Sequence, residues 1–375
     1  MSEVLARIRV RETAGIRRFL YPLSVVTGLP TTIVIGKTVG EMYGALQNSR
    51  GETIPRQIIS LNRAFDYRIG FALSLAPGET QELVLVQGAF LDTMPDPLHI
   101  STTLDGGIKN TQERFTVSIH PEGSIGEVVY DGVRHLRGSS QIQRNDETAW
   151  HSSTIAHNYG LDSFLHALLL AKSRYEDGSF AQTRAELTAC KSWVTVTHQV
   201  EQPKPNDEIV FTLPLAVTSP MLTCDFGVGG YVFGKLDSKA KEIVWRTEFG
   251  DAPYAKWTIA TTGRVDYVGE VDSAEAFLPQ RWFHLIDSDK ALAVAVTKLP
   301  KDCREMTVRL THEGDISLAF TLGDTVSGPA EFGVCYHFLN DVPAIAAATN
   351  PQSILLPPTV EVLEPLPLVP RSLPC

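Results

Sequence analysis

Residues 148–164, TAWHSSTIAHNYGLDSF, hold the densest group of side chains that could transfer protons or bind a substrate. An imidazole or a phenol can remove a proton on one side of a substrate and deliver one on the other. We therefore name His151, His157 and Tyr159 as candidate catalytic residues and Trp150 as a candidate substrate-binding residue. The alternative interpretation is an exposed polar connection between two sheets.

The spacing of these histidines argues against a shared metal ion. His151 and His157 are six residues apart, which is ~20 Å along one strand face or about 120° around a helix. No Cys or His pair elsewhere has the spacing of a zinc site. We expect neither a metal nor another cofactor.

A second candidate group lies at residues 278–287, LPQRWFHLID. A tryptophan beside a histidine is a surface on which a sugar ring can stack, so Trp282 and His284 are candidate substrate-binding residues. Arg281 is a candidate catalytic residue by its type. The alternative is a tryptophan packed on the outer face of a sheet.

Three other patterns indicate structure more than chemistry. Residues 226–234, FGVGGYVFG, have no helix after them and so do not fit a dinucleotide site. Glu176 and Asp177 are paired carboxylates of the kind used in glycoside hydrolysis, but neighbours in a hairpin turn normally point apart. His337 shares a predicted strand face with Cys335, which favours a core histidine.

Composition limits the classes of partner. The net charge of −10 over 375 residues is spread along the chain, which disfavours nucleic acid. No apolar run is long enough to span a membrane or act as a signal peptide, so we expect a cytoplasmic protein unless a leader has been removed. The five cysteines are odd in number and far apart, which predicts core residues and no disulfide framework. The oligomeric state stays open.

The elements that position these residues follow a period of two. More than a dozen runs alternate apolar and polar residues between turn-rich spacers, for example RFTVSIH (114–120), SWVTVTH (192–198) and DISLAFTLG (315–323). The pattern predicts an all-β protein of stacked antiparallel sheets, a sandwich or supersandwich, with one or two short helices. The main helix is expected at 162–173, where Phe164, Leu165, Leu168 and Leu169 form one stripe, although the Leu run also fits a buried strand.

We predict three regions: an N-terminal β-sandwich at 1–147, a C-terminal β-sandwich at 148–356 and a proline-rich tail at 357–375. The prolines of the tail should deny it the hydrogen bonds of a strand ladder.

Two stretches resemble known families. RVRETAGIRRFLYPLSVVTGLP (9–30) resembles the opening of β-sandwich domains in exo-acting rhamnogalacturonan lyase-like proteins, and residues 173–201 resemble the paired long strands of the galactose-mutarotase-like supersandwich. The resemblance implies a fold shared by polysaccharide lyases and glycosidases. It also implies a tyrosine or histidine base, an acid, and a cation that neutralises a uronate. No position matches a specific catalytic motif, and the sequence has no room for the helical toroid that such lyases usually carry.

The sequence thus predicts a carbohydrate-active protein, a lyase that cleaves a uronate-containing glycan by β-elimination. Two alternatives stay open: a non-catalytic carbohydrate-binding or assembly sandwich, and a sugar isomerase, epimerase or glycoside hydrolase. The expected partner is a carbohydrate, with neither nucleic acid nor a membrane involved.

Overall fold

The structure of the chain is a computed structural model. It describes residues 4–28, 45–60, 66–86, 98–158, 166–218, 221–225, 231–235, 242–249, 255–261, 264–268, 275–276, 282–287, 290–311, 313–340 and 354–365. Within these ranges, side chains are not described for residues 26–28, 57–60, 66–68, 156–158, 221–276 and 364–365.

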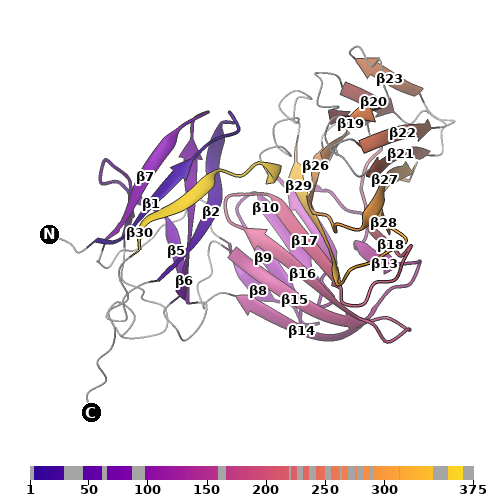
Figure 1. Ribbon diagram of the computed structural model, residues 1–375, viewed down its shortest axis with the longest axis horizontal. Coiled ribbons are helices and arrows are strands. Elements are labelled where there is room, and N and C mark those ends of the chain that lie inside the picture. Colours follow the sequence, from indigo (N-terminus) through magenta and orange to yellow (C-terminus); the bar gives the residue numbers. More distant parts are fainter. Residues whose placement is uncertain are drawn as a thin grey trace.

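The fold is all-β, as the period of two predicts. The largest sheet has ten antiparallel strands, in the spatial order β14 (Trp150–Asn158), β15 (His166–Arg174), β16 (Phe180–Thr188), β17 (Trp193–Val200), β29 (Ala330–Leu339), β26 (Ala291–Lys298), β25 (Trp282–Ile286), β19 (Met221–Asp225), β20 (Tyr231–Lys235) and β23 (Arg264–Val268). Figure 1 shows this sheet at the centre of the molecule, with β14 at one edge.

Two sheets pack against one face of the ten-stranded sheet. One has the order β13 (Gln141–Arg144), β18 (Glu208–Pro214), β28 (Asp315–Leu322), β27 (Cys303–Thr311), β21 (Glu242–Phe249), β22 (Ala255–Thr261) and β24 (Glu275–Ala276). The other has the order β12 (Val133–Arg134), β11 (Ile125–Tyr130), β10 (Phe115–Ile119), β9 (Ile108–Thr111) and β8 (Ile100–Thr102). Apolar side chains of all three sheets form one continuous core.

The remaining two sheets form an N-terminal group. They are β30 (Thr359–Pro365), β1 (Val4–Arg11), β7 (Thr80–Val86), β3 (Ala45–Gln47) and β4 (Thr53–Ile54), and then β2 (Arg18–Gly28), β6 (Asp66–Leu75) and β5 (Arg56–Ser60). Figure 1 shows this group in indigo and purple at one end of the molecule, with the yellow β30 against β1. Its core also takes in Trp193 and Cys335, so the group packs on β17 and β29 of the large sheet.

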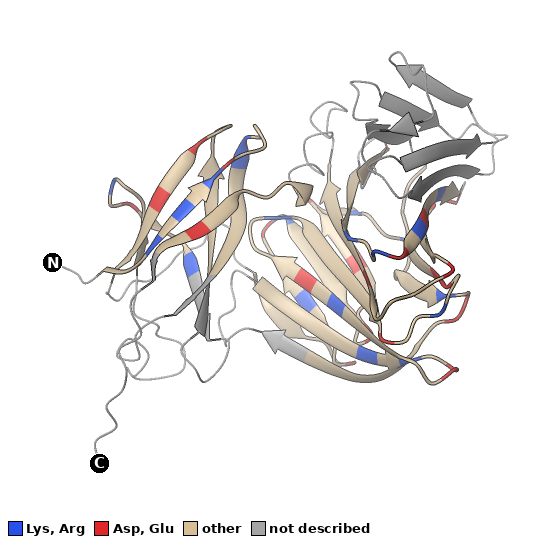
Figure 2. Ribbon diagram, in the orientation of Figure 1, with Lys and Arg blue, Asp and Glu red and all other residues tan. Residues whose placement is uncertain are grey.

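Alternation explains why the large sheet has two different faces. In β16, Ala181, Thr183, Ala185 and Leu187 are buried, and the residues between them are half-exposed. Successive side chains of a strand point to opposite faces. The apolar face therefore packs on the two neighbouring sheets, and the other face carries polar groups. Figure 2 shows acidic and basic positions interspersed over the described strands and turns.

The helix predicted at 162–173 is wrong from residue 166 onward, because His166–Arg174 form strand β15. This strand pairs along its whole length with β16 and also pairs with β14. The leucine run suits this strand as well as a helix, because Leu168 and Leu169 are buried on opposite faces of β15 and Leu170 is half-buried. In the described residues, helical backbone is limited to Ile354 and Leu355.

The tail also differs from expectation. Thr359–Pro365 form β30, which pairs with β1 at the edge of its sheet. Prolines are tolerated on an edge strand because one side of that strand needs no ladder hydrogen bonds.

The hydrophobic cores show which sheets pack together and not where one domain ends and the next begins. The domain boundaries at residues 147 and 356 therefore stay predictions. The described part of the chain contains no helix of the length and apolarity that crossing a bilayer requires.

Candidate functional site

The register of the ten-stranded sheet places one row of side chains across five strands. Glu186 pairs with Thr195, Thr195 with Cys335, Cys335 with Ala295, and Ala295 with Trp282. Directly paired residues of antiparallel strands share a face. We call the face that carries Glu186 the polar face.

Part of the polar face is covered and part is open. The N-terminal group packs on Trp193 and Cys335, and Ile354 and Leu355 pack on Trp282. Over β14, β15 and β16, in contrast, many side chains of this face are exposed or half-exposed. These are Trp150, Ser153, Ile155, His166, Leu170, Lys172, Arg174, Phe180, Gln182, Arg184 and Glu186.

An arginine and a glutamate lie on β16, in the open part next to β17. The Nη2 atom of Arg184 is 2.5 Å from Oε1 of Glu186, and each side chain is 37% exposed. Among the described residues, Glu186 is the one polar partner of Arg184, and the buried Nε of Arg184 has no hydrogen-bond partner. A guanidinium has five N–H donors, so Arg184 keeps donors for an anion.

A histidine lies beside this pair. His166 on β15 is half-buried and directly opposite Thr188, whose Oγ1 is 3.4 Å from Nδ1 of the imidazole. Glu186 is two residues before Thr188 on the same face, a diagonal neighbour at ~7–8 Å between backbone positions. The open face therefore brings together a cation for a carboxylate and two groups that can transfer protons.

The cysteine of the same row is not a nucleophile. Burial raises the pKa of the Cys335 thiol to about 12, although Thr195 donates a hydrogen bond to it. A thiol with that pKa stays protonated near neutral pH, and the thiolate is the reactive form. Cys335 is therefore a core residue, as the sequence predicts.

The sequence-predicted residues of 148–164 do not all lie on the same face of the sheet. Trp150 begins the edge strand β14 on the polar face and is 72% exposed. His157 lies in β14, where its backbone pairs with Leu168 in the row of Glu186. The side chain of His157 and the whole of Tyr159 lie outside the described residues.

His151 is placed away from the polar face. It pairs with Ser173, whose side chain is buried on the apolar side of β15. Its Nε2 is 2.5 Å from the hydroxyl of Thr154, and that hydroxyl donates to the backbone oxygen of Pro121. The exposed imidazole of His151 is thus linked through Thr154 to the connection before β11.

The second group of sequence-predicted residues, at 278–287, lies on the polar face, but its described side chains are buried. Trp282 is 9% exposed and His284 is 1% exposed, with ring centroids 5.3 Å apart. They are six strands from β14, which is ~29 Å across the sheet. Arg281 lies outside the described residues. The structure therefore does not bring the two groups together.

His337 is a core histidine, as its strand pattern predicts. It is 8% exposed and pairs directly with Trp193. Burial lowers the pKa of His337 to about 3, and the nearby charge of Lys191 acts in the same direction. The imidazole is neutral near pH 7 and does not serve as an acid there.

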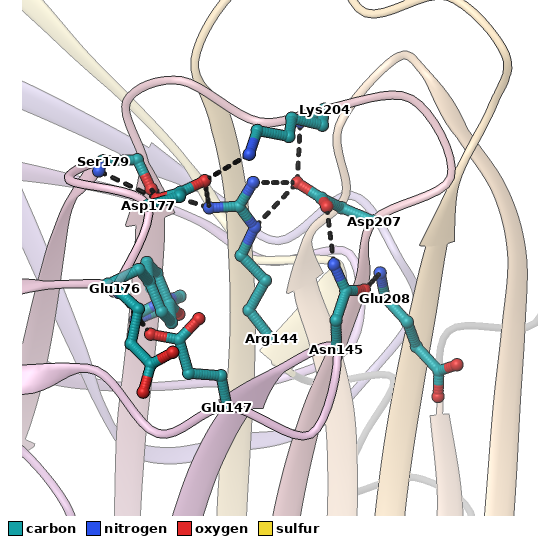
Figure 3. Close-up of polar contacts among 11 residues, drawn as sticks. Arg144, Asn145, Glu147, Glu176, Asp177, Ser179, Lys204, Asp207 and Glu208 are labelled. Atoms are coloured by element: carbon teal, nitrogen blue, oxygen red, sulfur yellow. Dashed lines mark hydrogen bonds and ion pairs between the residues drawn. The ribbon is translucent and has the colours of Figure 1, made fainter.

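The acidic turn at Glu176 and Asp177 belongs to a structural network, which we call the Arg144 network (Figure 3). Arg144 binds Asp207 at 2.7 Å and Asp177 at 3.2 Å, and Lys204 binds Asp177 at 2.6 Å. The hydrogen bond from Lys204, followed by those from Ser179, holds the pKa of Asp177 well below its usual value.

A general acid of a glycosidase needs a raised pKa. Asp177 is thus unsuited to the hydrolytic role that the sequence allows for this turn. The network instead ties together the turns that follow β13, β15 and β17.

Sequence reasoning overlooked Arg184 and Glu186. The segment AQTRAELT does contain the signal, because Gln182, Arg184 and Glu186 alternate with Ala181, Thr183 and Ala185. A strand with charges along one face needs either solvent or a ligand on that side. Within the described ranges, no group of three or more His, Cys, Asp or Glu residues is arranged to hold a metal ion.

Comparisons with known proteins bear on the fold. No protein-family model matches the sequence, and no curated protein matches it significantly. The chain is similar to a protein in the glycosyl hydrolase family 38 from Enterococcus faecalis, with a TM-score of 0.57, 10% identity, and coverage of 96% of this chain and 48% of that one. It is equally similar to an alpha-mannosidase from Enterococcus faecalis V583, at 0.57 and 10%, covering 96% and 46%.

The chain thus spans about half the length of these two structures. A galactose 1-epimerase from Lactobacillus acidophilus NCFM is less similar, with a TM-score of 0.35, 10% identity, and coverage of 67% of this chain and 100% of that one. None of these three is a rhamnogalacturonan lyase. At such identities the comparisons show that the chain shares the β architecture of the first two structures over nearly its whole length.

Proposed function

We propose that this protein is carbohydrate-active and that it binds a uronate-containing glycan on the open part of the polar face. The observation that carries the proposal is Arg184, a half-exposed guanidinium with one polar partner, on a sheet face lined with polar side chains. The structural neighbours support the coarser part, because one is described as a glycosyl hydrolase family 38 protein and another as an alpha-mannosidase.

The finer part of the proposal is β-elimination. In that reaction a base removes the C5 proton of the uronate, the C4–O bond to the departing sugar breaks, and that oxygen gains a proton as a C4–C5 double bond forms. When the proton on the carbon next to a carboxylate is removed, negative charge builds up on the carboxylate oxygens. A cation bound to the carboxylate therefore stabilises the transition state. Arg184 is suited to this role because a guanidinium can bind a carboxylate through two parallel N–H donors.

Two sets of residues could move the protons. His166 and Glu186 lie beside Arg184 on the described part of the polar face. His157 and Tyr159 are the pair that the sequence favours, and the backbone of His157 shares a row with Glu186. A positioned acid or base contributes about 10²–10⁴-fold to a rate.

The test is incubation of the protein with pectic, ulvan-type and glucuronan-type polysaccharides. Elimination gives an unsaturated uronate with new ultraviolet absorbance. Reducing ends without that absorbance would replace the lyase with a hydrolase, and ring or epimer exchange in NMR spectra would replace it with an isomerase. Binding without turnover would indicate a carbohydrate-binding module.

Arg184→Gln is compared with Gln143→Ala in this assay. Both positions are half-exposed on strands, and Gln143 lies on β13 of the seven-stranded sheet, outside the polar face. Arg184→Gln should abolish the activity on uronate polymers, whereas Gln143→Ala should preserve it. Unchanged activity in Arg184→Gln would refute the role of Arg184.

A further inference from the structure

Two exposed aromatic rings and an arginine lie in one row at the outer end of the polar face. Trp150 pairs directly with Arg174, and Arg174 pairs directly with Phe180. Trp150 is 72% exposed and Phe180 is 52% exposed. The guanidinium of Arg174 lies over the ring of Phe180, with 4.3 Å from Cζ to the ring centroid. We call Trp150, Arg174 and Phe180 the Trp–Arg–Phe row.

This row is displaced from Arg184 along the sheet. Phe180 and Arg184 are on the same face of β16, four residues apart, which is ~13 Å along the strand. Gln182 lies between them, opposite Lys172, and both side chains are exposed or half-exposed. A ligand that reached both places would be longer than a single sugar.

The charge along this path is positive. Lys172, Arg174 and Arg184 are its basic residues, and Glu186 is the one acidic residue among the described side chains of this face on β14–β17. The chain as a whole has a net charge of −10. A local basic path on an acidic protein attracts anionic ligands by its charge.

We propose that the Trp–Arg–Phe row is a distal subsite for an acidic polysaccharide chain, so that the protein acts on polymers rather than on free sugars or dimers. The proposal rests on the proposed function, because it extends the glycan from Arg184 to the edge of the sheet. The rings of Trp150 and Phe180 would stack on the C–H faces of sugar rings, and Arg174 would bind a carboxylate between them.

The chemistry of the row favours a glycan over a protein partner. The large exposed patches that mark protein-binding sites are contiguous and apolar, whereas here two rings are separated by a guanidinium and followed by Gln182 and Lys172. Two exposed aromatic rings on β14 and β16, with a cation on the strand between them, suit a linear ligand with apolar ring faces and regularly spaced carboxylates.

The experiment compares two lengths of the same glycan. Polygalacturonate and its unsubstituted dimer serve as probes, with binding measured by titration calorimetry and NMR line broadening. Trp150→Ala and Phe180→Ala should each weaken polymer binding by about tenfold or more, as the loss of an aromatic anchor does. Binding of the dimer at Arg184 should stay within about twofold, and Arg184→Gln should weaken both probes.

The matched control is Leu104→Ala, because Leu104 is a fully exposed large apolar residue in the turn between β8 and β9. It should leave the binding of both probes unchanged. Thermal unfolding of each variant should match that of the wild type, since exposed side chains contribute little to the core.

The possible results distinguish failure of the subsite from failure of the proposed function on which it rests. If Trp150→Ala and Phe180→Ala bind polymer like the wild type, the subsite is refuted while binding at Arg184 stands. If neither probe binds the wild type, the proposed function fails and the subsite fails with it. If light scattering shows that the wild type is a dimer and Trp150→Ala a monomer, the row is an interface between copies and the proposal is overturned.

Discussion

The indole of Trp193 and the imidazole of His337 meet edge to face on neighbouring strands, with ring centroids 5.7 Å apart and planes at 71°. Tyr21 of the N-terminal group meets the same indole at 6.0 Å and 80°. Trp193 therefore contacts His337 within the large sheet and joins the N-terminal group to that sheet through its contact with Tyr21.

Replacing Trp193 with alanine should destabilise the protein by about 3–5 kcal/mol, the usual cost of truncating a buried tryptophan. Chemical denaturation measures the loss, and limited proteolysis should show earlier cleavage within the N-terminal group. Trp150→Ala, at an exposed position, should cost less than about 0.5 kcal/mol. Equal losses for the two variants would mean that the N-terminal group does not depend on Trp193.

Stability should fall as the pH decreases from about 6.5 to about 4, because burial lowers the pKa of His198 from 6.5 to about 4. The unfolded chain then binds a proton in this range before the folded chain does, which favours unfolding. Each unit of pKa difference corresponds to about 1.4 kcal/mol. His337 contributes with the same sign.

Denaturation midpoints between pH 4 and pH 7 test this dependence on His198. The imidazole lies between the hydroxyls of Tyr175 at 3.0 Å and Thr183 at 2.9 Å. His198→Gln retains polar ends and should flatten the slope. Tyr175→Phe should lower stability at every pH yet keep the slope of stability against pH. If the slope is lost in Tyr175→Phe but kept in His198→Gln, His198 is not the titrating group.

Arg144→Met should cost about 3–5 kcal/mol, because it leaves the carboxylate of Asp207 buried without its charge partner. The side chain of Asp207 is 2% exposed and receives contacts from Nε of Arg144 at 2.8 Å and Nη2 at 2.7 Å. Lys204→Met removes a charge that is 61% exposed and should cost no more than about 1 kcal/mol. The two unfolding midpoints, measured at the same salt concentration, check the contrast.

His157→Ala and Tyr159→Phe should each lower turnover by about 10²–10⁴-fold if they are the base and acid of the proposed elimination. Tyr159→Phe is the sharper test because it removes a hydroxyl and keeps the ring. Arg184→Lys keeps the charge but loses the paired donors, and it should raise KM more than it lowers kcat. Active but unstable His157 and Tyr159 variants would mean that residues 148–164 are structural.

The strands were predictable because their sequences alternate at the period of two. In β28, Ile316, Leu318, Phe320 and Leu322 are all buried, and the residues between them are not. The error at 162–173 has a local cause. Leu168 and Leu169 fit a helical stripe with Phe164 and Leu165, and the run of three leucines at 168–170 fits a strand as well. The pairing with β14 and β16 that decides between them is not visible in the sequence.

The candidate site was less predictable than the fold. Alternation in AQTRAELT marks a charged strand face, but which face is open depends on pairings between distant segments. Trp193 on β17 pairs with His337 on β29, and the N-terminal group then covers this part of the face. Trp282 and His284 fit a sugar platform by residue type, yet the same long-range packing buries them.

The pairing of β1 with β30 has a consequence for the order of folding. The hydroxyl of Thr359 donates to the backbone oxygen of Arg11, 348 residues earlier in the chain. During synthesis, β1 must wait for nearly all the other described strands to leave the ribosome before it gains this neighbour. Contacts between such distant residues form slowly. β1, the earliest of the described strands in the chain, should therefore be among the last to be completed, and until then its free edge is open to chaperones or to the wrong strand.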